Sequence, residues 1–349
     1  MTYDLHRHLE GSHSASALLE VAREFGVKAA PFFVDGAWQS ETALNHQLTL
    51  AGPSSGLAFY ACINLARAAY VSVPAVKALA RRAFLEAATE CDGFELRVSL
   101  FSMTRTLLEN ETGAKVSWAN VSTLDWAKRS EELLDAVLSA RDEAEQQTRV
   151  PMHVRLGYSR TFESEAHYRA LSPLIRARAK ALSGLDVLGI VPGGDREPMP
   201  EALRAIIDEV RADVGDLTVH AGEFEGHASV DKTLASMKPQ AIGHGVRSVE
   251  SDTTLEALRQ GGVTLEVCPH SNHLLIHDEL AALVAQRGAH PLVALQRAKV
   301  HAVLGSDDPT PMGTDFRQEW QRAKALGVDL ARLEADAARR WAQLGRRPV

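Results

Sequence analysis

Two histidines near the start of the chain, His6 and His8, have the type and spacing to bind a metal ion. The sequence around them is typical of a short β-strand that runs into a turn, and alternate side chains of a strand point to the same face. Two imidazoles one pleat apart can therefore bind one ion. Gly11 would allow the sharp turn that follows them. Alone the pair is a weak indication, because polar histidines at a strand end need no ligand.

Far downstream, three further short motifs place polar residues directly after apolar segments. They are Val-His-Ala-Gly-Glu at 219–223, Gly-His-Gly at 243–245 and Ser-Asp-Asp-Pro at 306–309. Each has a plain alternative when it is taken alone. His244 could be a hydrogen-bonded core histidine, Glu223 a solvent-exposed loop charge, and Asp307 with Asp308 a helix cap before a proline. Their common position at the ends of predicted strands makes a shared site the better interpretation.

The elements that must position these residues alternate regularly along the chain. Helical patterns separate apolar strand patterns at residues 94–100, 150–156, 185–191, 217–220, 241–244, 263–267 and 300–304, which make eight strands with the first one. Eight βα units without a break in composition predict an α/β protein with a single-domain (β/α)8 TIM barrel over residues 1–349. A doubly wound open sheet is the competing architecture.

The segment 28–72 interrupts this alternation and is predicted to be a helical insertion after the first strand. Its first part is poor in pattern, whereas 57–71 carries an aromatic and aliphatic stripe. Such a stripe is more often helix packing than a ligand site. The insertion could still form a lid over the active site.

In a barrel of this kind the active site lies at the C-terminal ends of the strands. Three imidazoles and a carboxylate, with one position left for water, form a good site for a single Zn²⁺ ion per chain. The predicted ligands are His6, His8, His220 and Asp307. Zinc can lower the pKa of bound water toward about 7 and so provide hydroxide at neutral pH.

Three other side chains would serve a hydrolytic reaction there. His244 is the candidate base that orients or deprotonates the hydroxide, and Glu223 is the candidate acid for a substrate nitrogen. Asp308 could accept a hydrogen bond from the substrate, which His8 would also border. Signatures of other chemistries are absent from the sequence, among them GxSxG, the Walker A motif, GxGxxG, HExxH and the HxE…PCxxC pattern of cytidine deaminases.

Composition narrows the class of partner and compartment. A net charge of -7 argues against nucleic acid and acidic membranes, and no apolar run approaches the roughly 20 residues of a membrane span. Three widely spaced cysteines, Cys62, Cys91 and Cys268, predict free thiols in a reducing compartment. Removing a leader would remove His6 and His8, so we expect an uncleaved cytoplasmic protein, either a monomer or a homodimer.

With these residues in place, the chain resembles the adenosine deaminase family of the amidohydrolase superfamily. The matching segments begin at Asp4 (DLHRHLEGS), Val219 (VHAGE), Ile242 (IGHGVRS), Leu265 (LEVCPHSN) and Ser306 (SDDP). The resemblance is strong over the first twelve residues and from about 217 to 320, and faint between 28 and 190. It implies a (β/α)8 barrel with one zinc ion on the four ligands given above.

The resemblance also implies how a purine would bind. Glu223 would protonate N1, His244 would position the hydroxide that adds at C6 before ammonia leaves, and Asp308 would accept a hydrogen bond from N7. The backbone N–H of Gly194 would hold N3. Glu10 stands where adenosine-specific members commonly carry an aspartate that contacts the ribose.

We therefore expect hydrolytic deamination of a 6-aminopurine, with adenosine as the leading substrate. Glu10 and the divergent insertion leave a second hypothesis open, in which adenine or another amino-heterocycle is the substrate. A third hypothesis, from another class, is a metal-binding barrel without catalytic turnover.

Overall fold

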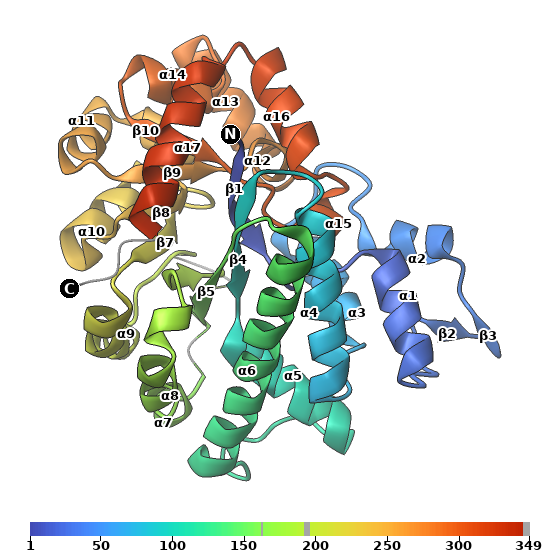
Figure 1. The fold of residues 1–349 in the computed structure, drawn as a ribbon. Coiled ribbons are helices and arrows are strands. Elements are labelled where there is room, and N and C mark those ends of the chain that lie inside the picture. The colour runs from blue at the N-terminus through green and yellow to red at the C-terminus, as the bar shows by residue number, and fades with distance from the viewer. Residues whose placement is uncertain (162, 192–195, 345–349) are drawn as a thin grey trace.

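Eight parallel strands form the centre of the fold (Figure 1). The computed structural model describes residues 1–161, 163–191 and 196–344. The strands follow one another around the barrel in chain order, which is the arrangement of a (β/α)8 barrel, so the predicted architecture is confirmed and the open sheet was wrong. Their bounds are β1 Tyr3–His8, β4 Gly93–Val98, β5 Met152–Ser159, β6 Gly184–Leu188, β7 Leu217–Ala221, β8 Ala241–His244, β9 Thr264–Val267 and β10 His301–Leu304.

The first and last strands meet at a short closing seam, formed by residues 6–8 and Asp307. The backbone N–H of Asp307 donates to the carbonyl of His6 at 2.8 Å, and the N–H of His8 donates to the carbonyl of Asp307 at 2.7 Å. These bonds form a single parallel bridge between Arg7 and Asp307. The seam therefore lies beside three of the predicted ligands.

Helices surround the barrel, and several begin at a serine that the sequence places before an amphipathic run. The Ser72 side chain accepts a hydrogen bond from the first turn of α4, as Ser14 does for α1 and Ser122 for α6. None of the helices among the described residues has the length and apolar character of a membrane crossing. The helix bounds are α1 Ala15–Glu24, α2 Glu41–Leu48, α3 Gly56–Arg67, α4 Val73–Ala87, α5 Leu100–Thr112, α6 Thr123–Thr148, α7 Glu165–Arg169, α8 Ser172–Ala177, α9 Glu201–Val214, α10 His227–Met237, α11 Asp252–Gly261, α12 Pro269–Leu275, α13 His277–Arg287, α14 Pro291–Arg297, α15 Pro309–Met312, α16 Phe316–Ala325 and α17 Leu330–Leu344.

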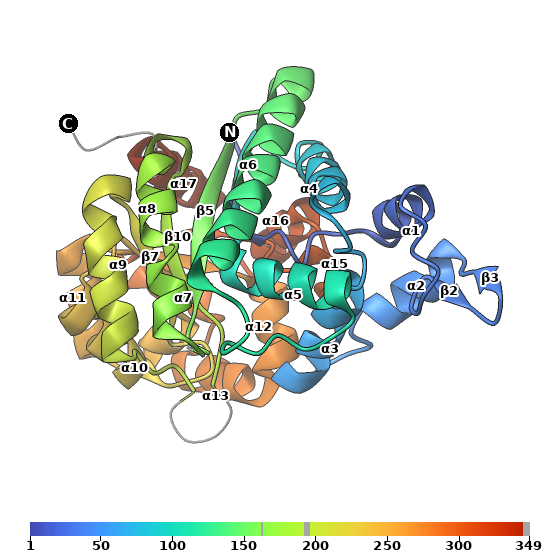
Figure 2. The ribbon, with the colours of Figure 1, turned by 90° about the horizontal axis from the view of Figure 1, so that it is seen from below.

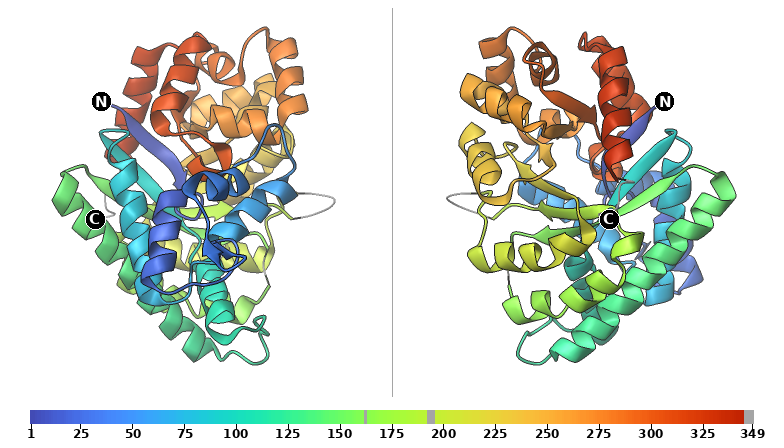
Figure 3. Two further views of the ribbon diagram at one scale, coloured as in Figure 1. Left: turned by 90° about the vertical axis from the view of Figure 1, so that its right-hand side faces the viewer. Right: turned by 60° about the vertical axis from the view of Figure 1, so that its left-hand side comes forward.

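The insertion after β1 contains a small hairpin, β2 Phe33–Val34 with β3 Ala37–Trp38, followed by α2 and α3. The hairpin lies at the edge of the molecule, away from the barrel (Figure 2). The rest of the segment is attached to the C-terminal half of the chain. The N–H of Leu50 donates to the carbonyl of Pro311 at 2.8 Å, and the N–H of Ser54 to that of Leu274 at 2.8 Å. In the left view of Figure 3 the N-terminal segments lie across the face of the barrel turned toward the viewer.

Inside the barrel, the strands carry buried charges as well as apolar side chains. Arg155 donates to Glu95 at 2.9 Å and to Asp216 at 2.8 Å, and Arg340 of α17 donates to the other oxygen of Asp216 at 2.6 Å. Although burial alone would raise the pKa of Asp216, these two guanidinium groups lower it to about 2.

This ion cluster makes a testable contribution to stability. Because the pKa of Asp216 is lower in the folded chain than its usual 3.8, its contribution is complete above pH 4 and is lost as the pH falls toward 2. The loss amounts to about 2 kcal/mol. An Asp216→Asn protein should be less stable at pH 7, and the difference from the unmodified protein should narrow below pH 4. Urea unfolding from pH 7 to 2 measures this, and a pH-independent difference would contradict it.

Candidate active site and metal centre

The four predicted ligands come from the ends of three strands and meet at the mouth of the barrel. β1 orients His6 and His8 to the same side, β7 contributes His220, and the seam brings in Asp307 directly after β10. The Nε2 atoms of His6 and His220 are 3.1 Å apart. Asp307 Oδ1 lies 3.5 Å from His6 Nε2 and 3.4 Å from His8 Nε2. Ligand atoms about 2.0–2.1 Å from a tetrahedral zinc ion would be about 3.3 Å apart, so the four side chains fit such an ion.

Two buried carboxylates determine which ring nitrogen of His6 and of His220 faces the centre of the site. Glu266 Oε2 lies 3.2 Å from Nδ1 of His6, and Asp186 Oδ1 lies 3.1 Å from Nδ1 of His220. Each carboxylate favours a proton on Nδ1 and leaves Nε2 as a bare acceptor. Two bare acceptors 3.1 Å apart repel each other unless a cation lies between them. The close approach of these two Nε2 atoms therefore indicates a divalent ion independently of the tetrahedral spacing of the ligands.

Close packing and backbone strain hold the site in place. His244 and Asp307 have positive φ values of 59° and 61°, a conformation that is uncommon for non-glycine residues. Gly11 lies in the turn expected after β1, in which the N–H of Ser12 donates to the carbonyl of Leu9 at 3.0 Å, although its φ is not among the positive ones. A Cβ atom on Gly11 would lie 2.0 Å from Oδ1 of Asp308, so the glycine is required by close approach.

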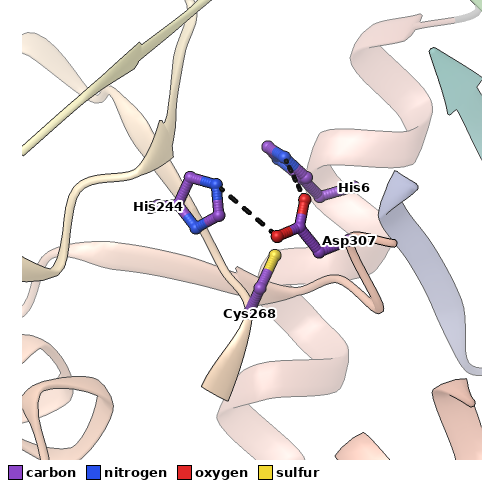
Figure 4. Close-up of side chains that lie close together, drawn as sticks. All are labelled: His6, His244, Cys268 and Asp307. Carbon is purple, nitrogen blue, oxygen red and sulfur yellow. Dashed lines mark ion pairs between the residues drawn. The ribbon is translucent and has the colours of Figure 1, made fainter. Parts of the chain in front are cut away.

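Figure 4 shows His6, His244 and Asp307 pointing toward one another, with the thiol of Cys268 beside them. Asn272 Nδ2 lies 3.2 Å from Nδ1 of His244 and can donate to it, which leaves a proton for Nε2. That Nε2 atom is 3.5 Å from Glu223 Oε2 and 4.0 Å from Asp307 Oδ2. His244 is therefore oriented toward the centre as a neutral hydrogen-bond donor.

The electrostatics separate the carboxyl groups into two kinds. Although burial would raise its pKa, Asp307 is held ionised by His244 and His6, which lower its pKa well below the usual range. Burial, and then the charge of Asp307, raises the pKa of Glu223 and of Asp308 well above the usual range. Burial also lowers the pKa of His8 and His244 well below that of free imidazole. Although burial would lower it, hydrogen bonds to Asp307 and Glu266 raise the pKa of His6. The site thus combines imidazoles of pKa shifted in both directions with one ionised carboxylate and two carboxyl groups of raised pKa.

One pocket joins the site to the insertion. Helix α3 supplies one wall with Phe59, Tyr60, Ile63 and Arg67, and apolar residues after β6 and in α12 supply others. Seven of the predicted site residues line it: His8, Glu10, His220, Glu223, His244, Asp307 and Asp308. His6 contacts the others from below the pocket, and Gly194 lies outside the described residues.

Sequence reasoning missed several residues that support this site. Glu266 and Asp186 lie within apolar strands, and a charged residue in the middle of a buried strand was the available signal. Asn272 stands in a motif that was noticed without a role for that side chain. Arg67 gave no signal, because a basic residue near the end of a helix is most often exposed.

A parallel barrel that gathers imidazoles and carboxylates around one point at its strand ends belongs to the class of barrels built to hold a divalent metal ion. The sequence model of the family described as "Adenosine deaminase" matches residues 2–341, so this chain belongs to the adenosine deaminase family.

Individual relatives agree with the family. A protein of Chelativorans sp. (strain BNC1) named adenine deaminase is 34% identical over 145 residues, which are 41% of this chain and 42% of that protein. Among curated relatives of this name, the match spans from 31% to 56% of the relative's length. Each of these relatives is named for adenine, which does not support the expectation of adenosine as the leading substrate.

Two solved structures share the fold over nearly the whole chain. Adenine deaminase from Arthrobacter aurescens has a TM-score of 0.75 at 18% identity, covering 98% of this chain and 96% of that one. An amidohydrolase from Burkholderia ambifaria, solved with bound Zn, has a TM-score of 0.70 at 16% identity, covering 98% and 89%. At these identities the likeness establishes the fold.

Proposed function

We propose that the protein hydrolytically deaminates a 6-aminopurine at a single metal centre, with free adenine as its leading substrate. The observation that carries the proposal is one pocket in which a metal-ligand set adjoins a carboxyl group with a raised pKa, that of Glu223. Membership in the adenosine deaminase family supports the reaction type, and the relatives named adenine deaminase support the base over the nucleoside.

His6, His8, His220 and Asp307 would hold one divalent ion, for which zinc is the best candidate from the ligand types. When bound, such an ion supplies hydroxide at neutral pH by lowering the pKa of water at its open position. The carboxylates of Glu266 and Asp186 would keep two of the imidazoles in the tautomer that ligation needs.

The remaining steps belong to the side chains around the pocket. His244, with its Nε2 proton directed inward, would orient the attacking oxygen toward C6 of the purine. Glu223 would donate its proton to N1, which weakens the ring bond at the carbon under attack. Asp308, in its protonated form, would donate a hydrogen bond to N7. That direction is opposite to the one expected from the sequence, because N7 of a purine protonated at N9 has a lone pair and no proton; the raised pKa of Asp308 is in keeping with it.

The insertion at 28–72 would serve as a lid. Helix α3 already forms a wall of the pocket, with the aromatic rings of Phe59 and Tyr60 against which a planar base can pack. The attachment of this segment at Leu50 and Ser54 to the C-terminal half would hold it over the barrel mouth.

A panel of aminopurines tests the proposal. Zinc-loaded protein is mixed with adenine, adenosine and AMP while ammonia release and ultraviolet absorbance are followed, and the Glu223→Gln protein serves as control. We expect turnover of adenine well above that of adenosine. Turnover of no aminopurine by metal-loaded protein would overturn the proposal and favour a metal-binding barrel without catalysis.

A further inference from the structure

Where Glu10 and Arg67 line the pocket, two buried polar atoms lack partners among the described residues. One is Oε2 of Glu10, whose side chain is 3% exposed, and the other is Nε of Arg67. Oε1 of Glu10, in contrast, accepts the backbone N–H of Ser99 at 3.2 Å and lies 3.5 Å from Nη2 of Arg67. This part of the pocket thus offers one acceptor and one donor, held side by side by an ion pair.

We propose that Glu10 and Arg67 bind the N3/N9–H edge of a free aminopurine base and so select the base over its N9-substituted nucleosides. The proposal rests on the proposed function and assigns two residues to its specificity. In a free base, N3 accepts and N9–H donates, and one carbon separates the two nitrogens. Oε2 of Glu10 would accept from N9–H. Nε of Arg67 would donate to N3, in place of the backbone N–H of Gly194 that the family resemblance implies and that lies outside the described residues.

The order of residues around the pocket agrees with the order of atoms around a purine. Around the rim of a purine, N1 and C6 of the six-membered ring come first, and N7, C8 and N9 of the five-membered ring follow. Glu223 and the metal ligands are followed by Asp308, and the residue after Glu10 packs directly on that aspartate. A base with N1 at Glu223 and N7 at Asp308 therefore turns N9 toward Glu10.

The charges nearby disfavour the other obvious role for Arg67, which is binding a substrate phosphate. Its guanidinium already faces the Glu10 carboxylate at 3.5 Å. A second pocket that Arg67 also lines, called the outer chamber here, is lined by two further cations, Arg105 and Lys115, and both are paired with carboxylates. Arg105 lies 3.2 Å from Glu109, and Lys115 lies 3.0 Å from the same side chain. A dianionic phosphate would meet compensated charge in this part of the pocket.

Two adenine analogues test the assignment on the unmodified protein. 9-Methyladenine lacks the N9 proton, and 3-deazaadenine lacks the N3 acceptor. We expect each to show a kcat/KM, and an affinity measured by calorimetry, about 10- to 100-fold below that of adenine, because each leaves one buried polar atom without a partner. AMP should bind more weakly than adenine.

Two variants then link each analogue to one residue. Glu10→Ala should reduce the penalty for 9-methyladenine to a few-fold and leave that for 3-deazaadenine in place. Arg67→Met, which keeps the length of the side chain, should reduce the penalty for 3-deazaadenine and leave that for 9-methyladenine in place. Arg105→Met makes the same change in the outer chamber and should leave both penalties as they are.

The outcomes separate the two proposals. If both analogues are turned over as fast as adenine, the assignment of Glu10 and Arg67 is overturned and the deaminase function stands. The same holds if AMP binds more tightly than adenine and loses that binding in Arg67→Met. Turnover of no aminopurine would overturn both. If either variant fails to fold, the analogue rates of the unmodified protein still decide.

Discussion

The Glu223→Gln protein is expected to bind its metal ion and adenine normally and to turn adenine over about 10²- to 10⁴-fold more slowly. The glutamine amide can still donate a hydrogen bond to N1, but it has no acidic proton to transfer. Burial and Asp307 raise the pKa of Glu223 well above its ordinary value, which favours the protonated form that the unmodified protein needs as a general acid. The loss should therefore fall on kcat rather than on KM.

Steady-state kinetics on adenine measure this effect, and metal analysis of the same samples excludes loss of the ion. Glu225→Gln is a matched control, because it makes the same chemical change two residues further along the loop and its side chain is absent from the pocket lining. A Glu223→Gln protein that keeps its rate within about tenfold would show that another group supplies the proton.

Replacing Asp307 should have the second large effect, which is loss of the metal ion. Asp307 is the predicted carboxylate ligand, and its Oδ1 lies within 3.5 Å of both His6 and His8. Loss of a group that hydrogen-bonds a metal ligand costs roughly 10- to 100-fold in metal affinity. Removing Asp307, itself a predicted ligand, should weaken zinc binding by more than that. Activity should fall with the bound metal.

The substitution needs care, because Asp307 has a φ of 61° and its backbone forms the closing seam. Asp307→Asn keeps the shape and tolerates that backbone conformation, whereas Asp307→Ala adds strain. Metal content by mass spectrometry, with chelator competition for affinity, measures the effect in both variants. Glu223→Gln should retain its metal. Equal zinc affinity in Asp307→Asn and the unmodified protein would remove Asp307 from the ligand set.

The strand order and the core of the site could be predicted from the sequence because both depend on local patterns. Each strand is an apolar run with a polar residue at its end, and the barrel rule then brings His6, His220 and Asp307 together without any knowledge of contacts. Pairing at the seam confirms that distant residues meet as the topology requires.

Other elements could not be predicted, because tertiary contacts determine them. Residues 94–100 were expected to form one strand, but β4 ends at Val98 and α5 begins at Leu100. Between β5 and β6 the chain forms two short helices, α7 and α8, with Pro173 in the first turn of α8. The pairing of Arg67 with Glu10 joins two elements that no sequence period connects.

The closing seam gives the metal ion a mechanical role in addition to its chemical one. His6 and His8 belong to the first strand and Asp307 follows the last, so an ion bound to all three would clamp the two ends of the sheet across the shortest pairing in the barrel. We expect metal-free protein to open there first, with the N-terminal strand becoming the earliest segment to exchange its amide protons. Catalysis and the closure of the barrel would then depend on the same ion.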